Sequence, residues 1–170
     1  MKTKTYNVYK FDELTKEQKE KAIENLRDIN VNYDWWDFIE HDGSEVDLQM
    51  FDIYRGECDL HFNIHAISTA RAIVKNHGEK CDTYKLSDTF IHEFLPLEKI
   101  YDEDTEGDAI ENEDKMEELC EQYRKDLSQC YLKMLKAEEE YRYSDEAIIE
   151  TIQANEYDFT EAGEIDYEID

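Results

Sequence analysis

The chain has little proline and glycine, with one proline and five glycines among its 170 residues. Loop-dominated proteins and β-sandwiches use many of these turn residues, so the composition argues against both classes. No apolar run approaches the roughly 18 residues that indicate a transmembrane helix, which argues against such a span. The charged residues that follow Met1 do not resemble the apolar core of a signal peptide, so we expect a cytoplasmic protein.

Cysteine and basic residues are also scarce. The four cysteines, Cys58, Cys81, Cys120 and Cys130, are too few for a disulfide framework and favour reduced thiols in a cytosol. There are 19 Lys and Arg against 45 Asp and Glu, which gives a formal net charge of −26. The sequence therefore lacks the basic footprint of a protein that binds nucleic acid directly.

The negative charge is concentrated in the second half of the chain. Residues 1–85 carry 12 basic and 17 acidic side chains, whereas residues 86–170 carry 7 basic and 28 acidic ones, a net charge of −21. Duplex DNA carries one negative charge per about 1.7 Å, so this excess matches roughly 36 Å of duplex. Self-repulsion of this size is better tolerated when a cationic partner relieves it, so we predict binding to a basic protein.

Aromatic residues are plentiful, with 12 Tyr, 7 Phe and 2 Trp, and they can form a core. Apolar residues of period two on both sides of Gly56 predict a β-hairpin near 45–65, and a later alternation predicts another near 156–169. An apolar stripe of helical period predicts a long acidic helix near 112–141. These patterns predict an α+β fold, a helix-rich single domain with a small antiparallel sheet.

Polar residues mark the expected helix starts. Thr15 and Gln18 form a capping box, and Ser144 precedes the last helix. The remaining expected boundaries are four: caps at Asp34, at Ser68 or Thr69 and at Ser87, and a break or bend at Pro96.

Two patterns predict side-chain directions. Trp35 and Trp36 are adjacent on an expected helix, so they point about 100° apart and one can be buried while the other is partly exposed. Val46, Leu48 and Met50 alternate with polar residues, which is the period of a strand whose side chains point to opposite faces in turn.

The stretch from 102 to 114 is acidic and nearly without apolar residues. We therefore divide the chain into an α+β core at 1–100 with the central hairpin, an acidic linker or insertion at 101–114, and acidic helices with a terminal hairpin at 115–170 that pack on the core.

The strongest metal candidate is the sequence Cys58-x2-His61-x3-His65, because thiolate and imidazole at such spacing can bind zinc. If Cys58 lies on the side of its strand that faces the protein core, however, His61 and His65 point the other way. We therefore favour a buried thiol and surface histidines. No nucleophile signature surrounds Cys58 or Cys81, and the many carboxylates nominate no catalytic pair. We predict no metal, no cofactor and no enzymatic activity.

Several segments together resemble a group of small acidic proteins encoded by phages, prophages and mobile elements. They are YKFDEL at 9–14, EKAI at 20–23, DWW at 34–36, NHGEKC at 76–81, SDEAIIE at 144–150 and NEYDF at 155–159. The resemblance carries over no catalytic residue. It implies a phage-type inhibitor of a host defence nuclease in the bacterial cytoplasm, similar in size and charge to anti-CRISPR proteins.

The hypothesis is therefore a DNA mimic that blocks target DNA binding by a type II RNA-guided nuclease or its guide-RNA complex, with carboxylates opposite the Arg and Lys side chains that hold DNA and read its motif. Trp36 and Tyr143 are the expected aromatic anchors. The expected acidic surface has nine residues: Glu111, Glu113, Asp114, Glu117, Glu118, Glu121, Glu138, Glu139 and Glu140.

Two other functions stay open. The first is an antitoxin-like or structural interaction protein that neutralises a different basic partner, and the second is an uncharacterised enzyme. The Tyr, Leu and Met stripe of the long helix would also suit a homodimer, so the oligomeric state stays open. We expect no membrane partner.

Overall fold

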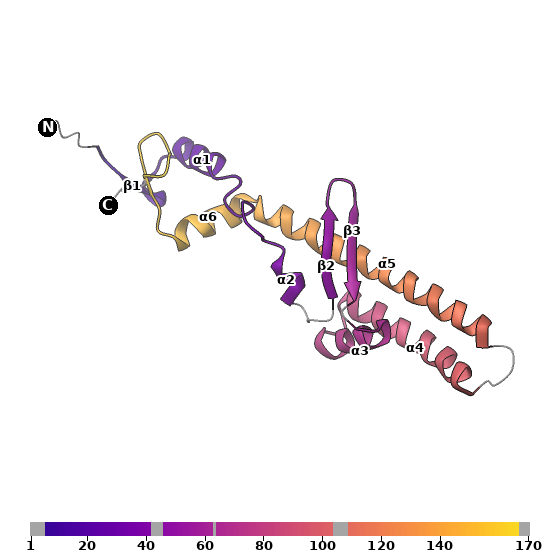
Figure 1. The fold of residues 1–170 in the computed structure, drawn as a ribbon. Coiled ribbons are helices and arrows are strands. Elements are labelled where there is room, and N and C mark those ends of the chain that lie inside the picture. Colours follow the sequence, from indigo (N-terminus) through magenta and orange to yellow (C-terminus); the bar gives the residue numbers. More distant parts are fainter. Residues whose placement is uncertain (1–5, 42–45, 63, 104–108, 167–170) are drawn as a thin grey trace. The chain divides into compact units, whose positions relative to one another are not determined.

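The computed structural model describes residues 6–41, 46–62, 64–103 and 109–166. The chain forms two compact units by its contacts, unit 1 (1–35 and 137–170) and unit 2 (36–136). The elements, in chain order, are β1 (Tyr9–Lys10), the 3-10 turn η1 (Phe11–Glu13), α1 (Lys16–Asn25), α2 (Asp37–His41), β2 (Val46–Asp52), β3 (Glu57–Phe62), α3 (Ala66–Asn76), α4 (Asp82–Glu103), α5 (Ala109–Arg142), α6 (Asp145–Ala154) and β4 (Asp158–Phe159) (Figure 1).

The predicted α+β class is confirmed, with helix predominating and two small antiparallel sheets, β1–β4 and β2–β3. The long helix and the central hairpin lie where the sequence patterns predict them. The predicted division into 1–100, 101–114 and 115–170 stays a prediction. Residues 104–108 of the expected linker lie outside the described residues, and the chain is helical up to Glu103 and again from Ala109.

In unit 1, α1 and α6 pack around Phe11 and Phe159, whose rings lie 6.0 Å apart. The capping box is confirmed, because the Thr15 hydroxyl accepts from the Gln18 N–H at 3.4 Å and the Gln18 side chain accepts from the Thr15 N–H at 2.8 Å. The Ser144 hydroxyl likewise accepts from the Ala147 N–H at the start of α6. These local hydrogen bonds fix where both helices begin.

The C-terminal segment is held against α1. After β4 the chain reverses direction and returns to form one antiparallel bridge between Phe159 and Ile165, while β4 itself pairs with β1. The Gln18 amide donates to the Glu161 carbonyl at 2.9 Å, and the Asn25 amide donates to the Gly163 carbonyl at 3.2 Å. The terminal hairpin predicted near 156–169 is thus a tight reversal with a single bridge, and residues 167–170 lie outside the described residues.

In unit 2, the hairpin of β2 and β3 turns one face toward the core. Leu60 is buried opposite Leu48, and the Phe62 ring lies 5.7 Å from that of Tyr123 on α5. Tyr123 also stacks on Phe90 of α4 at 4.2 Å. This aromatic cluster joins the hairpin, α4 and α5 in one core.

The pairing of β2 with β3 interrupts the alternation of Val46, Leu48 and Met50. A register shift between Leu48 and Met50 gives β2 one extra residue, a β-bulge. After the bulge Phe51 faces inward, 5.3 Å from the Trp36 ring, and Met50 faces outward with 55% of its surface exposed.

Several predicted helix boundaries are wrong. The helix expected after Asp34 begins at Asp37, so both tryptophans precede it, and α3 begins at Ala66 rather than after Ser68 or Thr69. Ser87 is a buried residue inside α4, which begins at Asp82. Small polar side chains can cap a helix, but Thr69 and Ser87 lie inside α3 and α4 and are fully buried.

Pro96 does not end α4, which runs on to Glu103. Proline leaves the carbonyl four residues earlier without its intrahelical partner, and that residue, His92, is exposed so that solvent can replace the bond. None of the described helices combines the length and the apolar character needed to cross a membrane.

Gly163→Ala should lower the free energy of unfolding by about 2–4 kcal/mol, measured in urea. Gly163 has a φ of +74°, and a Cβ there would lie 2.9 Å from the Gln18 carbonyl oxygen on α1. Glu156→Gly is the matched control, since Glu156 has a φ of 53° and glycine should be neutral or stabilise by up to about 1 kcal/mol. A Gly163→Ala protein as stable as the wild type would contradict this account of the C-terminal reversal.

Tyr123→Phe should make stability less dependent on alkaline pH. Burial raises the pKa of Tyr123 to about 12, although its hydrogen bond with the Ser87 hydroxyl at 2.8 Å opposes the rise. In the unfolded chain the tyrosine side chain ionises near pH 10. The stabilisation of the folded state by its protonated side chain is therefore full below pH 10, and about 3 kcal/mol of it is lost as the pH rises to 12. Urea unfolding between pH 9 and 12 should show a steeper loss for wild type than for the variant, and parallel curves would contradict the assignment.

Candidate protein-interaction surface

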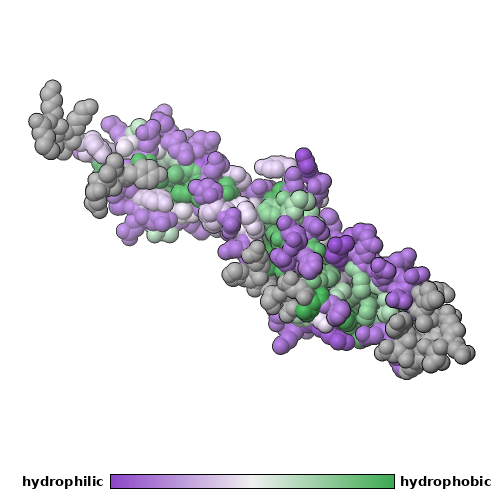
Figure 2. Space-filling model, in the orientation of Figure 1, coloured by the Kyte–Doolittle hydropathy of each residue, from purple (hydrophilic) through white to green (hydrophobic). Residues whose placement is uncertain are grey.

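Five acidic residues form one exposed face on the first half of α5. We call this face the acidic ridge, and its members are Glu113, Asp114, Glu117, Glu118 and Glu121. Glu113, Glu117 and Glu121 are spaced four residues apart and lie in one row, while Asp114 and Glu118 form the adjacent row. The ridge faces solvent because α5 buries Tyr123 and Leu127 on another side. Hydrophilic side chains cover most of the visible face of this helix (Figure 2).

The ridge has a density of carboxylates that approaches the density of phosphates in DNA. Its five carboxylates extend over about 12 Å of helix axis at 1.5 Å per residue. This is one carboxylate per about 2.4 Å, or one net negative charge per about 3 Å when Lys115 is counted, against one negative charge per about 1.7 Å for duplex DNA. A surface that attracts phosphates would therefore encounter a weaker field of the same sign, locally, on α5.

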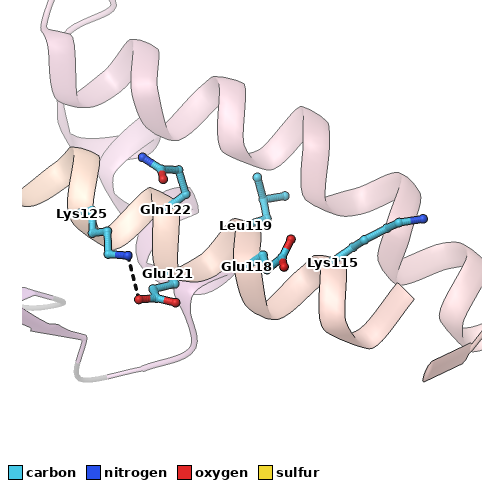
Figure 3. A pocket seen from close by; sticks show the side chains of 6 residues that line it. All are labelled: Lys115, Glu118, Leu119, Glu121, Gln122 and Lys125. Carbon is cyan, nitrogen blue, oxygen red and sulfur yellow. Dashed lines mark ion pairs between the residues drawn. The ribbon is translucent and has the colours of Figure 1, made fainter. Parts of the chain in front are cut away.

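A shallow groove lies along the ridge (Figure 3), lined by Lys115, Glu118, Leu119, Glu121, Gln122 and Lys125. The Lys125 ammonium lies 2.8 Å from the Glu121 carboxylate, and its hydrogen bond and charge lower the pKa of Glu121. Lys115 and Lys125 therefore offset part of the negative charge. All six residues come from α5, and the groove holds no convergent set of groups that resembles a catalytic site.

Glu138, Glu139 and Glu140 do not extend the ridge. They belong to unit 1, whereas the ridge belongs to unit 2. Three consecutive helical residues spread over about 200° of the helix circumference, so the three cannot all lie on one face. Of the three, Glu140 is exposed and Glu138 and Glu139 are half-buried.

Glu138 has a structural partner. Its carboxylate accepts from the Arg142 Nε at 2.8 Å. Arg142 also donates to the Asn30 carbonyl at 3.2 Å and to the Tyr33 hydroxyl at 2.7 Å, and it lies over the Trp35 ring at 5.7 Å. Glu138 therefore orients an arginine that joins α5 to the segment after α1, and it is a poor candidate for binding a partner.

The other predicted site residues occupy different environments. Glu111 lies in α5, but its side chain is outside the described part of the structure. Trp36 is half-buried against Phe51, and Trp35 is the buried member of the pair, with 5% of its surface exposed. Tyr143 is half-buried in unit 1, and its carbonyl accepts from Arg27 at 3.0 Å. The two expected anchors thus lie in different units.

The cysteine and histidine candidates do not come together. Within the described residues, no three His, Cys, Asp or Glu side chains are placed to hold a metal ion. Burial, together with the Asp59 charge, raises the pKa of the Cys58 thiol to about 11, and burial also raises the pKa values of Cys120 and Cys130. A thiol that stays protonated at neutral pH is a weak nucleophile, which argues against Cys58 as one.

Counting charges over half the chain missed a basic stretch inside α5. Residues 124–136 carry four basic side chains and one acidic one, whereas residues 143–170 carry ten acidic side chains and no Lys or Arg. The long helix is therefore acidic mainly at its start. The signal was present in the sequence and would have emerged from counting over windows of a few helical turns.

No protein-family model, curated protein or solved structure matches the chain.

Glu138→Gln should lower the free energy of unfolding by about 1 kcal/mol, because it weakens a partly exposed, charge-assisted hydrogen bond. Glu117→Gln, an exposed ridge residue without such a bond, is the matched control and should change stability by less than about 0.5 kcal/mol. Both can be measured by urea unfolding at neutral pH. Equal changes in the free energy of unfolding for the two variants would contradict a structural role for the Glu138 carboxylate.

Proposed function

We propose that the chain binds a basic, nucleic-acid-binding protein through the acidic ridge and prevents that protein from binding DNA. The observation that carries the proposal is the row of exposed carboxylates on one face of α5, at a density near that of DNA phosphates. Carboxylates in this arrangement can take the place of phosphates opposite Lys and Arg side chains. They gain affinity from released counterions as DNA does.

The class of partner follows from the resemblance to small acidic phage proteins. We propose a type II RNA-guided nuclease, whose cationic channel holds DNA by its backbone and whose arginines read the motif beside the target. The chain would then act as an anti-CRISPR inhibitor by occupying this surface before DNA arrives. The ridge residues are the proposed contacts, and Glu138 is not one of them.

The test is DNA cleavage by a purified type II effector with the order of addition varied. Inhibitor added before DNA should block cleavage, and pre-bound target DNA should prevent inhibition. Because the contacts are electrostatic, inhibition should weaken steeply as salt concentration rises. If several effectors are unaffected at low salt, the nuclease proposal is wrong and neutralisation of another basic partner takes its place.

A ridge variant tests the mechanism. It replaces four carboxylates by amides of the same shape: Glu113→Gln, Glu117→Gln, Glu118→Gln and Glu121→Gln. If each exposed pair contributes about 0.5 kcal/mol, inhibition should weaken about 30-fold. Its dependence on salt should also become shallower.

The control variant removes the same amount of charge from exposed positions in unit 1. Its substitutions are Glu20→Gln, Asp28→Asn, Glu161→Gln and Glu164→Gln. If inhibition depends on the ridge, the control should stay within about threefold of the wild type. Equal losses for both variants would show that net charge alone matters and would contradict a localised DNA-like surface.

A further inference from the structure

The β2–β3 hairpin presents an outward face that combines carboxylates with exposed apolar side chains. The register pairs Asp47 with His61, Met50 with Asp59 and Asp52 with Glu57 on this face. Met50 is 55% exposed, and Tyr54, in the turn that follows, is 89% exposed. Tyr54 has the highest exposed fraction among the large hydrophobic residues that the structure describes.

The tip of the hairpin is pre-organised. The Asp52 carboxylate accepts from the Arg55 N–H at 2.9 Å, and the Asp52 carbonyl accepts from the Gly56 N–H at 2.8 Å. Gly56 has a φ of +75°, which few other residues adopt without strain. Tyr54 is therefore held out to solvent on a turn whose backbone is fixed, so binding there would cost little conformational entropy.

Near the turn, the outward face carries an unfavourable pair of charges in the free chain, whereas Asp59 farther along already lies 4.0 Å from the Arg124 guanidinium of α5. Asp52 and Glu57 lie directly opposite each other across the strands, and like charges at such positions destabilise a sheet. The Arg55 Nε, 3.5 Å from the Asp52 carboxylate, offsets part of this repulsion on an exposed surface. A cationic group from a partner would relieve the rest.

We propose that the hairpin is the part of the interface that recognises arginine side chains of the same basic partner; this inference rests on the proposed function. An exposed aromatic ring near carboxylates offers a guanidinium both of its preferred contacts, a π-face to stack on and oxygens for paired hydrogen bonds. A lysine ammonium is a compact, strongly hydrated charge that can lie over a ring but can neither stack on it as a plane nor bond two oxygens as a fork, so it gains less from this pair of contacts. The hairpin thus offers an exposed ring, Tyr54, together with the carboxylates of Asp52 and Glu57, whereas the acidic ridge offers charge only.

The test measures binding of two fluorescein-labelled peptides of equal charge, nona-arginine and nona-lysine, by fluorescence anisotropy at low salt. Wild type should bind nona-arginine more tightly than nona-lysine. Tyr54→Ala should weaken nona-arginine binding about two- to fivefold, as expected for an exposed cation–π contact, and weaken nona-lysine binding by a smaller factor. The side chain is almost fully exposed, so the variant should fold normally, which circular dichroism can check.

Two further variants separate this inference from the proposed function. Tyr6→Ala truncates another exposed tyrosine, in unit 1, and should leave both affinities unchanged. The ridge variant should weaken both peptides equally, since its carboxylates do not distinguish the two cations. If Tyr54→Ala affects both peptides alike, or if wild type shows no arginine preference, arginine recognition by the hairpin is wrong while the ridge proposal stands. If neither peptide binds, both proposals are wrong.

Discussion

The packing of Tyr123 determines which side of α5 faces solvent. Its ring stacks on Phe90, and its hydroxyl shares a buried hydrogen bond with Ser87, so the helix is fixed in rotation about its axis. At 3.6 residues per turn, the carboxylates of the acidic ridge then lie about 80–180° around the helix from Tyr123. A contact in the core of unit 2 therefore determines the direction of a charged surface on the outside of the same unit. The same ring contacts Phe62, so the hairpin depends on the cluster as well.

Local patterns predicted much of the fold. The capping box at Thr15 and Gln18, the Ser144 cap and the stripe of α5 each follow from interactions within a few residues, which sequence periodicity records directly. Ser87 and Thr69 were misread because hydroxyl residues suit both a helix cap and a buried helix face. Only tertiary packing decides between the two, including the contact of Ser87 with Tyr123 on α5. The bulge at Met50 was missed for a similar reason, since alternation alone contains no signal for an inserted residue.

The candidate site was predictable only in part. Composition and charge asymmetry drew attention to the carboxylates of α5, but they treated every carboxylate as equivalent. Glu138 differs from Glu117 because Arg142 lies four residues later, which the sequence shows. It also differs because that arginine bonds to Asn30 and Tyr33, more than 100 residues away, which it does not. The proposed role of Tyr54 depends on its exposure, which a sequence pattern rich in apolar residues does not reveal.

The β-bulge before Met50 acts as a phase shift within the strand. Upstream of it the inward residues are Val46 and Leu48, at even positions, whereas downstream the inward residue is Phe51, at an odd one. Substitutions on the hairpin surface leave this parity intact, so the tip can change in chemistry without disturbing the core. Loss or gain of a single residue in β2 would instead turn the residues at one end of the strand to the opposite face. Phe51 would then be exposed and a carboxylate buried. The hairpin should therefore tolerate variation in sequence far better than variation in length.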